Sequence, residues 1–104
     1  MRVLPAGVAL FSPEESVWQA MLSGWRTQQL ARMLRISTVD GRVRAVARFQ
    51  RFTGTYPWSW TADDVESWLV SMRMPGPGGG GRSVGTLRNY QSTVAWFCAY
   101  LVNP

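Results

Sequence analysis

The chain has 104 residues, 46% apolar and 16% charged, a composition typical of one globular domain rather than a disordered chain. It carries a net charge of +5, and all eleven basic residues are arginine, which favours a polyanionic partner such as nucleic acid. It has no histidine and one cysteine, which excludes Ser-His and Cys-His catalytic pairs and an intrachain disulfide.

The first eleven residues are briefly apolar, but Pro5 and Gly7 interrupt them, so we expect no signal peptide. No apolar run in the sequence approaches the length of a membrane span. We therefore expect a cytoplasmic, nucleoid-associated domain that makes no contact with membranes.

The first predicted helix begins at Ser12, which can cap it, and Glu15 is positioned as a capping-box partner. Apolar residues then recur at helical spacing. Gly24 is expected to break or bend this helix, with a further helical piece over residues 26–34.

The second predicted helix opens at Ser37 and Thr38 and stops near Gly54, with Pro57 beyond it. A short aromatic loop, Trp58-Ser59-Trp60, follows. The apolar stripe of the helix consists of Val39, Val43, Val46 and Ala47, with Phe49 at its edge.

The third predicted helix starts at Thr61, with Asp64 as its capping-box partner, and ends before the proline and glycine run of residues 75–81. The last helix begins near residues 83–86 and has the strongest periodicity, carried by Leu87, Tyr90, Val94, Phe97 and Leu101. The sequence thus predicts an all-α, compact bundle of four to five short helices in one domain, residues 1–104.

A row of arginines lies opposite the valine stripe of the second helix. At about 100° per residue, Arg44, Arg48 and Arg51 fall within an arc of about 60°, with Arg42 at its border. No acidic residue occurs between Arg42 and Gly54. Ordinary solvated helix faces mix charges of both signs, so the row favours contact with a polyanion over a merely solvated face.

The last predicted helix has a polar face with Arg88, Asn89 and Ser92, and Arg82 lies just upstream. Arginine and asparagine can read base edges with two hydrogen bonds, and serine can reach phosphate. A simply exposed polar face explains the same residues equally well.

No catalytic residue, metal site or cofactor is predicted. The carboxylates cluster where helices are expected to begin, which favours capping and dipole compensation over a magnesium site. The glycine run of residues 76–81 lacks the Lys-Ser/Thr pair of a phosphate-binding loop.

The order of these signals resembles the N-terminal core-binding, SAM-like domain of phage integrases and other tyrosine recombinases. The matching residues run from Thr38-Val39 to Phe49, Gly54 and Pro57, then Thr61-Ala62-Asp63-Asp64, and finally from Thr86-Leu87 to Phe97 and Tyr100-Leu101. Arg42 departs from the pattern, because the family often has an aromatic residue there.

The resemblance implies a helical domain that grips duplex DNA through the helices led by Thr38 and Thr86, in support of site-specific recombination and DNA integration. The family's catalytic residues lie in a second domain that this chain lacks, so we expect DNA binding without cleavage. Expected partners are double-stranded DNA, a catalytic domain and other recombinase protomers. The alternative is a helical protein-interaction module that uses exposed Trp58, Trp60 and Trp96.

Overall fold

The fold was analysed in a computed structural model that describes residues 12–76 and 80–104. These residues form four α-helices and one 3-10 turn, with no β-strand among them, which confirms the all-α prediction. Predictions that fall on residues 1–11 lie outside the described part of the chain. The elements are α1 (Pro13–Ala31), α2 (Ile36–Thr53), the turn η1 (Pro57–Ser59), α3 (Ala62–Arg73) and α4 (Val84–Val102).

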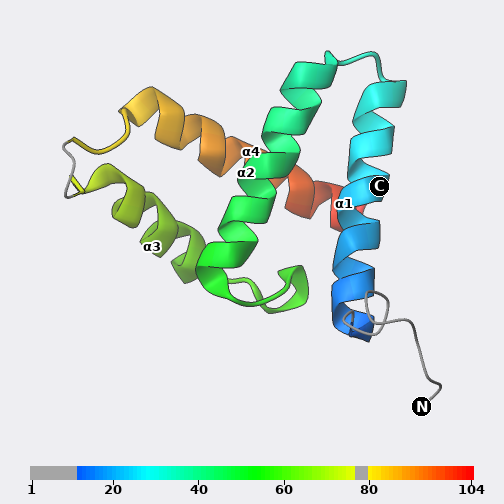
Figure 1. Ribbon diagram of the computed structural model, residues 1–104, viewed down its shortest axis with the longest axis horizontal. Coiled ribbons are helices and arrows are strands. Elements are labelled where there is room, and N and C mark those ends of the chain that lie inside the picture. Colours follow the sequence, from blue (N-terminus) through cyan, green and yellow to red (C-terminus); the bar gives the residue numbers. More distant parts are fainter. Residues whose placement is uncertain (1–11, 77–79) are drawn as a thin grey trace, which may run out of the picture.

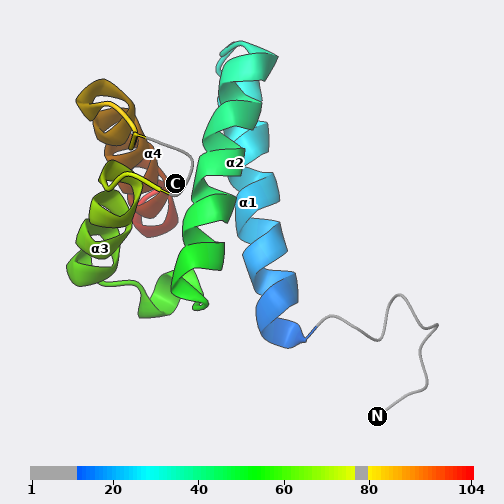
Figure 2. The ribbon, with the colours of Figure 1, turned by 60° about the vertical axis from the view of Figure 1, so that its left-hand side comes forward.

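The helices are arranged as two antiparallel hairpins, α1 with α2 and α3 with α4 (Figures 1 and 2). The hairpins meet where α2 crosses α4, and α1 also packs against the C-terminal part of α4. As a result α2 has neighbours on both sides, and only one strip of its surface stays open to solvent.

Capping residues begin three of the helices. Ser12 and Ser83 each accept a hydrogen bond from the backbone N–H three residues on. Thr61 and Asp64 form the predicted capping box, with N···O distances of 3.2 and 2.9 Å. Glu15 does not complete the capping box predicted for α1, because its carboxylate accepts hydrogen bonds from Gln19 and Tyr56 instead.

The ends of α2 differ in how well the sequence predicts them. The helix begins at Ile36, one residue before the predicted start, and Arg35 precedes it without a side-chain cap. Its end is confirmed: Gly54 adopts the left-handed conformation with φ 67°, which glycine takes without a steric cost.

Gly24 does not interrupt α1, so the prediction of a break there was wrong. The Tyr100 hydroxyl of α4 lies 2.6 Å from where a Cβ atom of residue 24 would be. Glycine at this position therefore allows α1 and α4 to approach closely. The helix ends instead at Ala31, where Met33 adopts φ 64° and the N–H of Leu34 bonds back to the carbonyl of Gln29.

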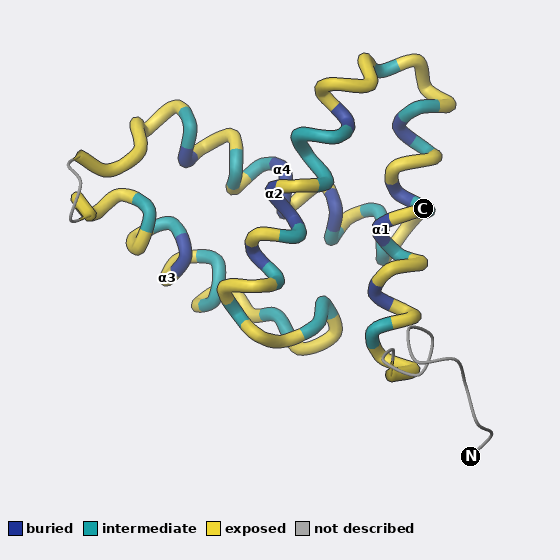
Figure 3. The backbone as a smooth tube through the Cα atoms, in the orientation of Figure 1, coloured by how far each residue is buried: buried dark blue, intermediate teal, exposed yellow. Residues whose placement is uncertain are grey.

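The core consists of two clusters, and the buried positions of each helix face inward (Figure 3). Trp60 packs against both clusters and so joins them. The first cluster contains Trp18, Leu22, Trp25, Val46 and Phe97, and the second contains Phe49, Trp68 and Val94.

Phe49 is the main correction to the predicted core. The sequence placed it at the edge of the valine stripe, but it is fully buried, with its ring 4.7 Å from that of Trp60 and 5.0 Å from that of Trp68. Ala47, assigned to the stripe, is only half-buried, and Ala45 is buried in its place. The buried face of α2 is therefore rotated toward α3 and α4.

Replacing Phe49 by Ala should destabilise the domain by about 3–5 kcal/mol, because it leaves a cavity between the rings of Trp60 and Trp68. Since small domains are stable by about 5–15 kcal/mol, thermal unfolding followed by circular dichroism should show a large fall in Tm. Phe52→Ala is the control on the same helix, because Phe52 is 45% exposed. Equal losses from the two substitutions would contradict this description of the core.

Candidate nucleic-acid interface

Two hollows adjoin along the groove between α2 and α4. They have volumes of about 270 and 330 Å³ and share Gly41, Ala45 and Tyr90. We call this continuous depression the α2–α4 furrow. Its remaining lining residues are Ser37, Thr38, Arg42, Arg44, Arg48, Asn89 and Thr93.

No carboxylate is among the described residues that line the furrow. Acidic side chains line hollows beside α3 instead, where Asp63 and Glu66 occur without an arginine. Asp40, the acidic residue of α2, is ion-paired with Arg26 of α1 at 2.9 Å. The fold therefore separates the charges, and the furrow is lined by arginines without a carboxylate among its described residues.

Tyr90 organises two arginines at the edge of the furrow. Arg48 donates a hydrogen bond to the Tyr90 hydroxyl at 3.1 Å, and its guanidinium carbon lies 6.0 Å from the ring centroid. The guanidinium carbon of Arg82, from the segment before α4, lies 5.6 Å from the same centroid. These contacts are within cation–π range. We call Tyr90, Arg48 and Arg82 the Tyr90 clip.

The clip rests on the core, because the Tyr90 ring packs 5.4 Å from the ring of buried Trp68. Neither arginine of the clip is ion-paired to a carboxylate within the described residues. Their donors therefore face solvent in a fixed place, where two anionic oxygens could be bound. Sequence analysis assigned Tyr90 only to an apolar stripe and missed this contact; the hydroxyl within that stripe was the available signal.

Two further arginines of the predicted row, Arg44 and Arg51, lie on the exposed face of α2. Arg44 and Arg51 are exposed on the same side of the helix as Arg48, and Arg44 lines the furrow. On α4, Asn89 lines the furrow, whereas Arg88 and Ser92 line neither of its hollows. The candidate surface is thus centred on α2 and the first turns of α4.

Arg42 does not lie at the border of the exposed row. It is half-buried, donates a hydrogen bond to Oε1 of buried Gln29 at 3.0 Å, and lies over the ring of Trp96 at 4.6 Å. On the helical wheel it falls between the buried Phe49 and Val46, which explains its inward direction. The Arg42 guanidinium covers part of the Trp96 ring, and the Arg42 side chain also lines the furrow.

The tryptophans expected to form an exposed protein-binding set do not share one environment. Trp58 and Trp96 are 50% and 47% exposed. Trp60 is half-buried between the two core clusters and donates from its indole N–H to the Thr55 carbonyl at 3.1 Å. It therefore serves packing rather than a surface.

Within residues 12–76 and 80–104, no three His, Cys, Asp or Glu side chains are grouped so that they could hold a metal ion. Burial raises the pKa of the Cys98 thiol, which keeps it neutral as it packs beside the second core cluster. No helix in the described part of the chain combines the length and apolar character needed to cross a bilayer.

The chain matches no protein-family model, no curated protein and no solved structure. The case for a function therefore comes from the residues and the geometry of this chain.

Removing Arg42 should destabilise the fold, whereas removing Arg44 should not. Arg42→Ala leaves the buried Gln29 oxygen without its donor and uncovers Trp96, at a cost of about 1–3 kcal/mol. Arg44→Ala alters an exposed side chain and should shift stability by about 0.5 kcal/mol or less. Chemical denaturation of both variants measures the difference; equal stabilities would show that the Arg42 contact contributes nothing.

Proposed function

We propose that this domain binds double-stranded DNA through the α2–α4 furrow and the arginine row beside it. The observation that carries the proposal is the convergence of Arg44, Arg48 and Arg82 around a depression without a carboxylate. Guanidinium groups offer several donors in a plane and match phosphate oxygens. Arginines gathered from two separate segments, without an ion-paired carboxylate among the described residues, are typical of a surface that meets a polyanion.

The dimensions of the surface suit a duplex. From Arg44 to Arg51 the row runs along roughly 10 Å of helix axis, and the major groove, about 12 Å wide, admits a helix. Phosphate contacts from such a row would set affinity and orientation without reading sequence. Asn89 lines the same furrow and could form paired hydrogen bonds with adenine.

The resemblance to core-binding domains of tyrosine recombinases favours a specific setting for this activity. The domain would hold DNA for site-specific recombination while another domain supplies the catalytic residues. Its partners would then be that catalytic domain and other protomers on the same DNA, in the cytoplasm at the nucleoid. The two helices that form the α2–α4 furrow are those that contain Thr38 and Thr86, the residues that lead the two segments of the resemblance.

The isolated domain should bind duplex DNA with a Kd on the order of 10⁻⁴ to 10⁻⁶ M at physiological salt, the range of mainly non-specific contacts. With roughly four phosphates neutralised, the slope of log K against log salt should be about −3.6. Replacing Arg44, Arg48 and Arg51 together by Ala should weaken binding across sequences and flatten the slope by up to about three units. Fluorescence anisotropy across a salt series measures both.

Arg73→Ala is the charge-matched control for each single substitution, because Arg73 is exposed at the end of α3. It should bind as the wild type does, and all variants should retain their Tm within a few degrees. Equal losses from Arg73→Ala and Arg44→Ala would mean that net charge alone governs binding. If DNA binding by the wild type did not weaken with added salt, phosphate contacts would be contradicted. That result would favour the alternative, in which the domain binds a protein partner through apolar side chains.

A further inference from the structure

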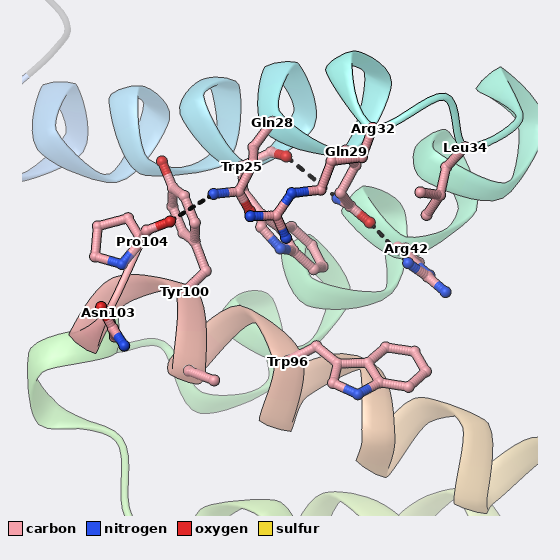
Figure 4. A pocket seen from close by; sticks show the side chains of 11 residues that line it. Trp25, Gln28, Gln29, Arg32, Leu34, Arg42, Trp96, Tyr100, Asn103 and Pro104 are labelled. Atoms are coloured by element: carbon pink, nitrogen blue, oxygen red, sulfur yellow. Dashed lines mark hydrogen bonds between the residues drawn. The ribbon is translucent and has the colours of Figure 1, made fainter.

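Another hollow, of about 360 Å³, lies between α1 and α4 (Figure 4). Figure 4 shows Trp96 and Tyr100 of α4 facing Gln28, Gln29 and Arg32 of α1 across it, with Arg42 of α2 at one side. Its volume falls within the range of about 300–1,000 Å³ typical of small-ligand sites. We call it the α1–α4 hollow.

The lining of this hollow combines flat rings with cationic and amide groups. Trp96 remains 47% exposed although Arg42 lies over its ring, so part of the indole is open to a ligand. Unpaired bases stack on aromatic side chains and on guanidinium planes. Arg32 is exposed at the hollow and can meet a phosphate. The Gln28 amide nitrogen already donates to the Pro104 carbonyl at 2.8 Å, so its oxygen, together with the Asn103 side chain, can meet the polar edge of a base.

Arg42 lines both the α1–α4 hollow and the α2–α4 furrow, so the two depressions meet at this side chain. No carboxylate is among the described residues that line either one. A strand whose phosphates lie along the furrow would therefore reach the hollow without meeting a negative side chain.

We propose that the α1–α4 hollow binds one unpaired nucleotide, with its base stacked on Trp96 and its phosphate between Arg32 and Arg42. The inference deepens the proposed DNA binding: the furrow holds paired DNA, and the hollow receives a base that has left the duplex. A nucleotide fits better than an apolar peptide, because two guanidinium groups and three side-chain amides surround the rings.

Three labelled probes test the proposal: a blunt duplex, the same duplex with a short thymidine tail, and a thymidine single strand alone. The wild type should bind the tailed duplex about tenfold more tightly than the blunt one, since stacking contributes about 1–3 kcal/mol per base. Trp96→Ala should abolish this gain and weaken single-strand binding. It should leave affinity for the blunt duplex unchanged within about twofold.

Trp58→Ala is the matched control, because Trp58 is 50% exposed, close to the exposure of Trp96. The Trp58 ring stacks on Tyr56, whereas the Trp96 ring is covered by the Arg42 guanidinium. The Trp58→Ala variant should retain the tail-dependent gain. Trp96→Phe keeps a ring and should retain most of it, and Arg32→Ala should lose several-fold affinity for the tailed duplex and the single strand but not for the blunt duplex. These two variants keep the test informative if Trp96→Ala lowers stability by releasing Arg42.

The outcomes separate this inference from the proposed function. No gain from the tail, or equal effects of Trp96→Ala and Trp58→Ala, overturns the nucleotide site even if the blunt duplex binds. Trp96-dependent binding of the single strand without binding of the blunt duplex supports the site and contradicts the duplex proposal. An acidic, tyrosine-containing peptide serves as a fourth probe, and its Trp96-dependent binding without binding of any DNA probe would overturn the nucleotide site and assign the hollow to a protein.

Discussion

Tyr90 connects the hydrophobic core to the candidate binding surface. One side of its ring packs against buried Trp68, which in turn packs against Phe49, and two guanidinium groups approach the same ring. Long exposed arginines normally lose rotamer freedom when they bind a ligand. Here Arg48 already donates to the Tyr90 hydroxyl, so part of that ordering has taken place before any phosphate arrives. The positions of Arg48 and Arg82 on the candidate surface therefore depend on how Tyr90 packs against Trp68.

The fold also determines where the positive charge is felt. Each carboxylate with a described polar contact is engaged in the frame: Glu15 with Gln19 and Tyr56, and Asp40 with Arg26. Asp64 completes the capping box of α3. Because the acids are used where helices begin or pair, the arginines of the furrow are left without a counter-charge. Separation of charge by the fold, more than the modest net charge, makes the surface suited to a polyanion.

Much of this arrangement could be predicted from the sequence, because helix type, the cap at Thr61 and the stop at Gly54 depend on local residues. The exposed row that includes Arg44 followed equally from the period of one helix. The predictions that failed depended on a second element. Gly24 lies within a continuous helix, where it leaves room for Tyr100, which is 76 positions away, and local sequence cannot reveal such an approach.

The same limit applies to the candidate site. Periodicity predicted one buried side for α2, but its three neighbouring helices bury Phe49 as well as Val46, and this turns Arg42 inward onto Trp96. The pairing of Arg48 with Tyr90 spans 42 positions and requires the crossing of α2 and α4 to be known. Side chains that act in pairs across elements therefore emerged only from the structure.

The central claim, that the α2–α4 face is the surface that meets DNA, is tested most directly by backbone amide NMR during titration with a short duplex at low salt. The account predicts that the largest shift changes occur in residues 37–51 of α2 and residues 82–93 at the start of α4. Residues 62–73 of α3, where acidic side chains line the hollows, should change little. Changes concentrated on α3, or spread evenly over all four helices, would contradict it.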